Sequence, residues 1–235
     1  NQRLSVLQAL KIFAPFLTPK GLLRRYHIFI SYRWSPFDTE LAIALFNSLS
    51  VSVLPDGAPL DVFLDRQRLE DGRMFATDFA TALINSTVVV PIVSFKALER
   101  MLTLAHDSEI DNVLLEWSLI VELVEAGDLS FCLPVMLGEV NMDADDRKKF
   151  VANLFVSGRI DKLPDVTCAA VTARVRELLV ANGKTPTREL DTRTVKGTVT
   201  KLIGLLGVPA WDVNTSHGGA AAAKMHAQPR WKQVL

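Results

Sequence analysis

The sequence predicts an α/β fold in which a doubly wound parallel sheet carries helices on both faces. Short runs of β-branched and aromatic residues alternate with longer stretches of helical periodicity from residue 26 to about residue 180. One of these runs, TVVVPIV at residues 87–93, is apolar throughout, which is typical of a parallel strand buried on both faces. Regular alternation of strand and helix produces parallel strands whose crossover helices cover the sheet.

The strands follow from short apolar runs between turn signals. They are expected at residues 26–31, 60–64, 87–93 and 131–137, with a short fifth strand near residues 160–163. The turn signal Pro55-Asp56-Gly57 precedes the second strand. Pro134 either weakens the fourth strand or places it near an edge, because proline has no N–H group to donate to a sheet.

The helices follow from apolar residues that recur every three or four positions. They are expected at residues 39–49, 74–84, 111–125, 143–154 and 167–179. Another helix, at residues 194–206, carries Val195, Val199, Leu202 and Leu206 on one stripe. We expect this last helix to pack on the domain or to form an assembly surface.

Composition indicates a globular protein without metal or disulfide chemistry. Hydrophobic residues make up 49% of the chain and charged residues 22%. The 26 basic and 26 acidic residues cancel, which argues against a protein that coats nucleic acid. Cys132 and Cys168 form neither a disulfide framework nor a metal-ligand pattern, and the four histidines are scattered. We therefore expect a reducing, cytoplasmic location, no metal and no nucleic-acid partner.

The chain divides into four expected regions. An N-terminal amphipathic extension covers residues 1–23, the sheet domain residues 24–182, a C-terminal helical extension residues 183–210, and a flexible tail residues 211–235. The first region is interrupted by Gln8, Lys11 and Pro15 and is too short to cross a bilayer, so we expect no membrane segment in this chain.

The ends of the first three strands carry the residues expected to bind a ligand. Ligands of open parallel sheets bind beyond the carboxyl ends of the strands. The three loops there mix aromatic, cationic and anionic side chains: SYRW at residues 31–34, DRQRLEDGR at residues 65–73, and SFK at residues 94–96. A nucleotide needs this mixture for stacking, for phosphate and for ribose hydroxyls, although charged loops can also be simply solvated. The chain has no Walker loop, no GxGxxG after a strand and no GxSxG elbow.

Glu116 is the most informative single residue. On a helical wheel of residues 111–125, Asp111, Ser118, Glu122 and Glu125 form the expected solvent stripe. Glu116 falls on the opposite, apolar side, with Asn112 beside it. A carboxylate on an apolar face is costly unless it is paired or lines a cavity. Glu116 is thus either a catalytic candidate or a buried partner of Arg33 or Arg73.

Four motifs in order resemble the TIR (Toll/interleukin-1 receptor) domain. They are FISYR at residues 29–33, VFLDxxxLxxG at residues 62–72, VVVPIVS at residues 88–94 and DNVLLEW at residues 111–117. The resemblance covers residues 24 to about 180. It implies a flavodoxin-like fold with five parallel strands and helices on both faces, here with helical extensions at both ends.

The resemblance also implies an activity. Some members of the TIR family cleave NAD+ to nicotinamide and ADP-ribose or its cyclic form, usually when self-associated, in immune or cell-death signalling. The catalytic glutamate of those members matches Glu116, which would stabilise the oxocarbenium-like transition state. NAD+ is then a substrate, and no cofactor is expected. The implied substrate-binding residues are Tyr32, Arg33, Trp34, Asp65, Glu70, Met74, Ser94 and Asn112.

Two departures from the family pattern affect the implied pocket. Many enzymatic members carry tryptophan where this chain has Asn112, and a relative has an aromatic residue where this chain has Met74. These changes leave the orientation of the substrate and the linear or cyclic outcome open. The alternatives are a non-enzymatic adaptor that associates with other TIR domains through residues 66–73, and an enzyme acting on another nucleotide such as NADP+. Ser31, Ser94 and Asp65 can also serve only the local backbone.

Overall fold

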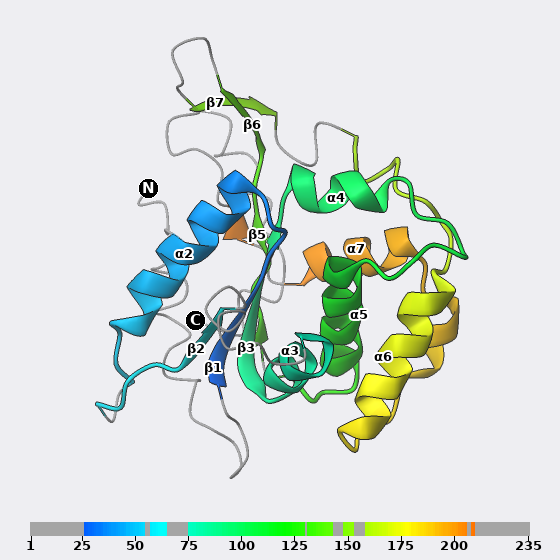
Figure 1. Ribbon diagram of the computed structural model, residues 1–235, viewed down its shortest axis with the longest axis horizontal. Coiled ribbons are helices and arrows are strands. Elements are labelled where there is room, and N and C mark those ends of the chain that lie inside the picture. Colours follow the sequence, from blue (N-terminus) through cyan, green and yellow to red (C-terminus); the bar gives the residue numbers. More distant parts are fainter. Residues whose placement is uncertain are drawn as a thin grey trace, which may run out of the picture.

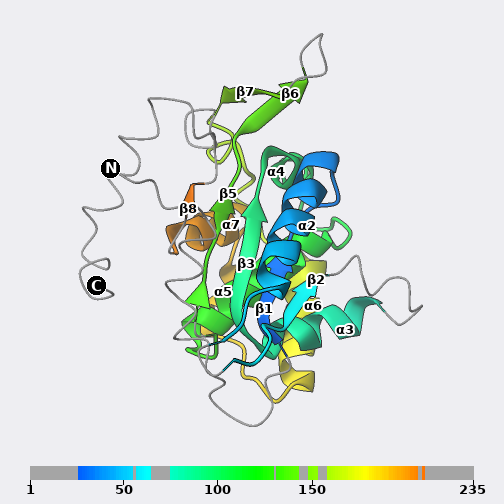
Figure 2. The same cartoon turned by 90° about the vertical axis from the view of Figure 1, so that its left-hand side faces the viewer.

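A parallel sheet forms the centre of the protein, as the sequence predicts. It has five positions for strands, here called lanes, and two short strands share one of them. The computed structural model describes residues 26–54, 57–64, 75–129, 131–142, 148–152, 158–205 and 208–209. The sheet has the order β2-β1-β3-β5-β8 (Figures 1 and 2), with β4 also paired to β3. All of its pairings are parallel. Its strands are β1 (Tyr26–Ser31), β2 (Val62–Leu64), β3 (Ser86–Val93), β4 (Phe131–Cys132), β5 (Val135–Met136) and β8 (Val208–Pro209).

The predicted strand at residues 131–137 is split in two at Pro134. β4 and β5 pair with β3 in one continuous register, Val88 with Phe131 and Ile92 with Val135, so they form a single lane. Pro134 has no N–H group, and the flanking Leu133 and Leu137 donate instead to the carbonyl groups of Val89 and Val93. Among the described strands, β4 pairs with β3 only, whereas β5 pairs with both β3 and β8, so Pro134 lies where this strand passes from the edge of the sheet to its interior.

The fifth lane comes from a different segment than the sequence predicts. Residues 158–163 form turns, so the strand expected near residues 160–163 is wrong. β8 takes that place beside β5. The short run at residues 160–163 contains two charged residues, Asp161 and Lys162, which are disfavoured in strands.

Helices cover both faces of the sheet, unequally (Figures 1 and 2). α2 (Pro36–Ser50) packs on one face, where Leu45 and Leu49 meet Ile28, Ile30 and the β3 side chains of the same face. The other face carries a thicker layer, in which α6 packs outside α5. The helices of that side are α3 (Phe75–Ile84), α4 (Phe95–Met101), α5 (Asn112–Glu125), α6 (Ala169–Ala181), the 3-10 helix η4 (Arg188–Thr192) and α7 (Val195–Gly204).

The helix predicted at residues 143–154 is wrong. The chain instead forms an antiparallel hairpin of β6 (Glu139–Met142) and β7 (Lys148–Ala152). The hairpin projects from the body at the carboxyl edge of the main sheet (Figure 1). β7 has five residues, of which Phe150 and Val151 are an apolar pair that suits a strand as well as a helix.

The core continues past residue 182, where the sequence suggests a domain boundary. Leu190, Val195, Val199 and Leu202 belong to the same buried cluster as α3, α5 and α6. Each of these four residues is no more than 2% exposed. Residues 183–205 are therefore part of the sheet domain. The N-terminal extension at residues 1–23 and the tail at residues 211–235 lie outside the described residues.

Candidate functional site

The carboxyl end of β1 meets the second turn of α5 through one hydrogen bond. Ser31 is the last residue of β1 and is 1% exposed. Its Oγ donates to Glu116 Oε2 at 2.5 Å. Glu116 is partly exposed, unlike the apolar residues beside it on the helix, such as Val113 and Leu119. The predicted catalytic carboxylate therefore lies at the edge of the sheet where ligands of this architecture bind.

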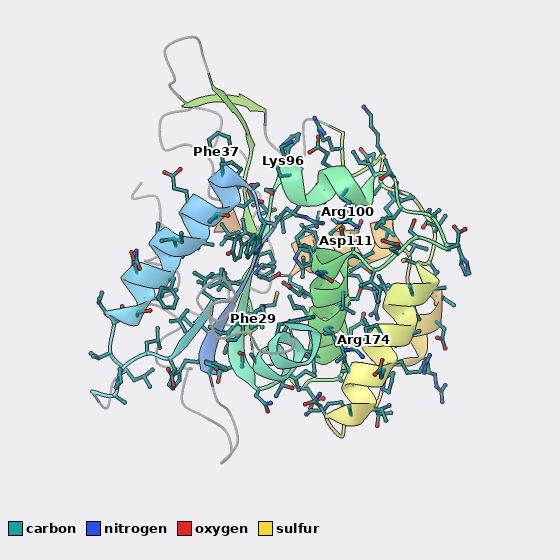
Figure 3. The ribbon with its side chains drawn as sticks, in the orientation of Figure 1. Phe29, Phe37, Lys96, Arg100, Asp111 and Arg174 are labelled. Atoms are coloured by element: carbon teal, nitrogen blue, oxygen red, sulfur yellow. The ribbon has the colours of Figure 1, made fainter. Side chains whose placement is uncertain are left out.

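An ion-pair cluster adjoins this contact. Arg33 Nη2 donates to both carboxylate oxygens of Asp111, at 2.8 and 2.7 Å, and also to the carbonyl group of Ala97 at 3.4 Å. Arg100 Nε lies 3.4 Å from Asp111 Oδ2. Asp111 is fully buried and caps α5 by accepting from Leu114 N. One carboxylate thus holds two guanidinium groups at the edge of the sheet, and Figure 3 shows Arg100 and Asp111 between α4 and the start of α5.

A second hydroxyl–carboxylate pair lies after β3. Ser94 Oγ donates to Asp38 Oδ2 at 2.5 Å and accepts from Ala97 N, so that it caps α4. Asp38, on α2, is 2% exposed. Burial raises the pKa of the Asp38 carboxyl to about 6, against the opposing effects of the Ser94 and Ser35 hydrogen bonds and of the Arg33 and Lys96 charges. This pair ties the beginning of α2 to the beginning of α4.

The remaining residues predicted to bind substrate differ in how exposed they are. Tyr32 is 5% exposed and packs in the α2-side core, which leaves little of its surface for a ligand. Trp34 is 58% exposed, and Asn112, the first residue of α5, is exposed as well. Arg33 and Ser94 lie at the edge, as described above. Asp65, Glu70 and Met74 lie outside the described residues, as does Arg73.

The predicted solvent stripe of α5 is wrong for three of its four residues, whereas Glu125 is exposed, as predicted. Ser118 is 5% exposed, Glu122 1% and Asp111 0%, because α6, η4 and α7 cover this side of the helix. Glu122 is compensated by Arg193, whose Nη1 contacts Glu122 Oε1, and by Thr187, whose backbone N and Oγ1 both donate to it. The stripe therefore faces a second layer of the protein. Of the two arginines proposed as partners of Glu116, Arg33 pairs with Asp111, and Arg73 lies outside the described residues.

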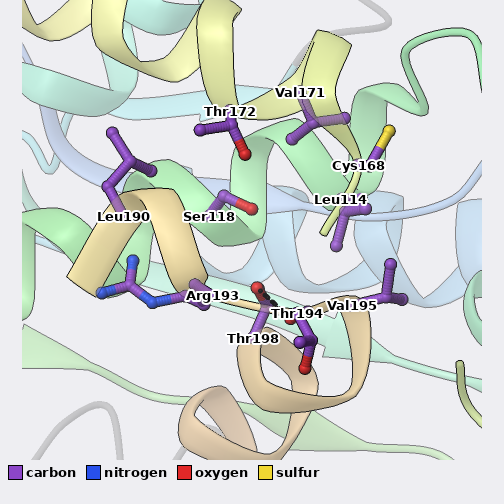
Figure 4. Close-up of a pocket in the computed structure, with 10 residues that line it drawn as sticks. All are labelled: Leu114, Ser118, Cys168, Val171, Thr172, Leu190, Arg193, Thr194, Val195 and Thr198. Atoms are coloured by element: carbon purple, nitrogen blue, oxygen red, sulfur yellow. Dashed lines mark hydrogen bonds between the residues drawn. The ribbon is translucent and has the colours of Figure 1, made fainter. Parts of the chain in front are cut away.

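A small cavity lies between α5, α6, η4 and α7 (Figure 4). It has room for about one water molecule, so it cannot hold a nucleotide. It contains none of the residues predicted to bind substrate. Its lining residues are Leu114, Ser118, Cys168, Val171, Thr172, Leu190, Arg193, Thr194, Val195 and Thr198.

Neither a cluster of metal ligands nor a membrane-spanning helix occurs in the described part of the chain. No group of three or more histidine, cysteine, aspartate or glutamate side chains could hold a metal ion there. No described helix is long and apolar enough to cross a membrane.

The arrangement at the edge of the sheet suits an anionic ligand that carries hydroxyl groups. Glu116 can accept hydrogen bonds from hydroxyl groups, and it can stabilise a developing positive charge. Arg33 and Arg100 offer guanidinium groups, which favour phosphate, and the exposed indole of Trp34 offers a stacking surface.

Sequence reasoning overlooked three residues of this edge. Arg100 lies on α4, a helix of seven residues that the periodicity did not reveal. Asp111 falls on the predicted solvent stripe, although an acidic residue just before an apolar helix is a recognisable capping signal. Asp38 follows the first strand, and no local pattern marks it as buried. The partners of both carboxylates come from distant parts of the chain, so only the fold identifies them.

Comparison of this chain with protein-family models, with curated proteins and with solved structures finds no match.

Proposed function

We propose that this protein is a TIR-type NAD+ nucleosidase that cleaves NAD+ to nicotinamide and ADP-ribose or cyclic ADP-ribose, and that self-association activates it. The observation that carries the proposal is the contact between Ser31 and Glu116 at the carboxyl end of β1. It supports the role that the family resemblance implies for Glu116, because a partly exposed carboxylate at this edge can reach a bound ligand.

The charges around Glu116 support a dinucleotide as the ligand. NAD+ carries a diphosphate, two riboses and two aromatic rings. Arg33 and Arg100 share the single carboxylate of Asp111, and the Arg100 side chain is 58% exposed. Guanidinium groups at this place favour a phosphate-bearing ligand. Trp34 would offer its exposed ring to one of the aromatic groups.

Cleavage of NAD+ requires the protein to stabilise one positively charged transition state. The bond between nicotinamide and C1′ of its ribose breaks, and its electron pair moves to the nicotinamide ring, which leaves as a neutral molecule. The positive charge passes to the ribose as an oxocarbenium-like centre. Glu116 would accept hydrogen bonds from the ribose hydroxyl groups and stabilise this charge. Attack of water at C1′ gives ADP-ribose and a proton, whereas attack of the adenine ring gives the cyclic product.

The test is release of nicotinamide by concentrated protein, followed by chromatography. Wild-type protein should release nicotinamide, while Glu116→Ala and Glu116→Gln should lose at least about 100-fold in turnover number. A matched control is Glu177→Ala on α6, which removes a glutamate that pairs with Arg174 and whose side chain is 65% exposed. The control should keep full activity, and circular dichroism should show that all variants are folded.

Two results would contradict the proposal. Turnover by Glu116→Ala at the wild-type rate would remove Glu116 from the chemistry. Absence of turnover by wild-type protein, even when crowding agents force it to associate, would favour the adaptor that acts through homotypic TIR–TIR contacts.

A further inference from the structure

We infer that Ser31 is a positioning residue of the proposed site: its hydroxyl fixes the Glu116 carboxylate at the edge of the sheet in the orientation that turnover requires. This inference rests on the proposed function for its activity readout. The family resemblance gives Ser31 no role in the site. From the sequence, its hydroxyl group could simply have bonded to the backbone at the end of the strand.

The side chain of Ser31 is committed to Glu116. A serine at the end of a strand commonly bonds to a nearby backbone group. Here Ser31 Oγ instead donates to a carboxylate 85 positions away in the sequence, at 2.5 Å. The hydroxyl group of Ser31 therefore joins the end of β1 directly to α5.

The donor is held rigidly. Ser31 lies in β1, which is paired with strands on both sides, and its backbone is in register with Pro91 of β3. The side chain is buried, with the residue 1% exposed. A serine in such a place has little freedom to move, so its hydroxyl provides a fixed reference point for any group that it contacts.

The acceptor needs such a reference point. Glutamate has three rotatable side-chain bonds, so the position of the α5 backbone alone does not define where the Glu116 carboxylate lies. The α5 backbone is well anchored by its buried apolar residues. The hydrogen bond from Ser31 fixes the carboxylate end of the side chain, as the buried residues fix the backbone. This matters because a small misplacement of a catalytic group greatly lowers the rate.

The experiment compares Ser31→Ala, Ser31→Thr and a matched control in steady-state cleavage of NAD+. Ser31→Ala should lower kcat by about 10- to 100-fold while KM changes by less than about twofold, because the lost interaction matters in the transition state. Ser31→Thr keeps the hydroxyl group and should recover most of the lost kcat.

The control is Ser86→Ala. Ser86 is fully buried, and its Oγ donates at 2.7 Å to the carbonyl group of Ala82, at the opposite edge of the sheet. The Ser86→Ala variant loses a buried hydroxyl group, as Ser31→Ala does. A loss of turnover caused only by lost stability would therefore appear in both variants. Thermal unfolding of each variant separates loss of stability from loss of turnover.

Crystal structures of wild type and Ser31→Ala complete the test and do not depend on activity. A displaced or disordered Glu116 carboxylate in the variant supports the inference. An unmoved carboxylate overturns it, as does an active wild type whose Ser31→Ala variant keeps its kcat. Should wild type show no turnover at all, the proposed function fails, and the position of the carboxylate alone then decides the role of Ser31.

Discussion

At the scale of single residues, three carboxylates near one edge of the sheet have three different environments. Asp111 is fully buried against two arginines, Asp38 is buried against a serine hydroxyl, and Glu116 is partly exposed with a serine hydroxyl donating to it. Their chemistry follows from these partners. Only the partly exposed one can reach a ligand without a change in the surrounding packing.

Asp38 makes stability depend on pH. Its pKa is raised from 3.8 to about 6 by burial, so the folded protein holds this proton more tightly than the unfolded chain does. The stabilisation is complete below about pH 4 and is lost as the pH rises through about 6. A change from 3.8 to about 6 corresponds to about 3 kcal/mol in the free energy of unfolding.

Asp38→Asn should remove this contribution. Relative to the variant, wild type should lose stability between pH 4 and pH 7 by an amount up to about 3 kcal/mol. Urea unfolding of both proteins across this range measures the difference. Parallel stability curves would show that Asp38 titrates alike in the folded and unfolded states.

At the scale of elements, a buried charge network joins the C-terminal segment to α5. Arg193 contacts both Glu122 and Glu125, Lys201 contacts Glu125, and Thr187 donates to Glu122. The side chains of Arg193 and Glu122 are 3% and 1% exposed, whereas that of Lys201 is 46% exposed. Burial should therefore make the Arg193 contacts matter more to stability than the Lys201 contact.

Arg193→Ala should lower the free energy of unfolding by about 3–5 kcal/mol, because it leaves Glu122 buried without its cation. Lys201→Ala, the matched control, should cost less than about 1 kcal/mol. Chemical denaturation measures both.

The double variant Glu122→Leu with Arg193→Met distinguishes lost charge compensation from lost packing. It should recover much of the stability, since it removes both buried charges together. A double variant less stable than Arg193→Ala would contradict this account of the network.

At the scale of the whole molecule, one core includes residues on both sides of position 182. Leu190, Val195, Val199 and Leu202 are buried in the same cluster as α5. Each buried aliphatic side chain contributes about 1.5–3 kcal/mol, so four contribute about 6–12 kcal/mol. That sum is comparable to the whole stability of an ordinary domain, about 5–15 kcal/mol.

A fragment ending at Asn182 should consequently fail to fold. It would expose the face of α5 that carries Ser118 and the buried Glu122. We expect no cooperative thermal transition in circular dichroism, whereas the full chain should show one. A fragment that melts cooperatively near the temperature of the full chain would mean that residues 183–235 add little to the core.

Local patterns were sufficient for most elements but not for the arrangement of the C-terminal part. The apolar run of β3 and the amphipathic α2 and α7 were predictable because burial dictates their residue types. The β6–β7 hairpin and the short α4 were not, since short segments carry too few residues to show a period. β8 has two residues, and its pairing with β5 decides its structure.

The sequence by itself determined the α/β class and most of its strands and helices, because these depend on residue types at regular spacing. It also singled out Glu116 as the residue to test. Only the tertiary structure decided which carboxylates are buried. A helical wheel separates two faces but does not say which face meets solvent, and α6, η4 and α7 cover the polar face of α5. The partners of Glu116, Asp111 and Asp38 come from distant segments, so only the packing of the chain could bring them together.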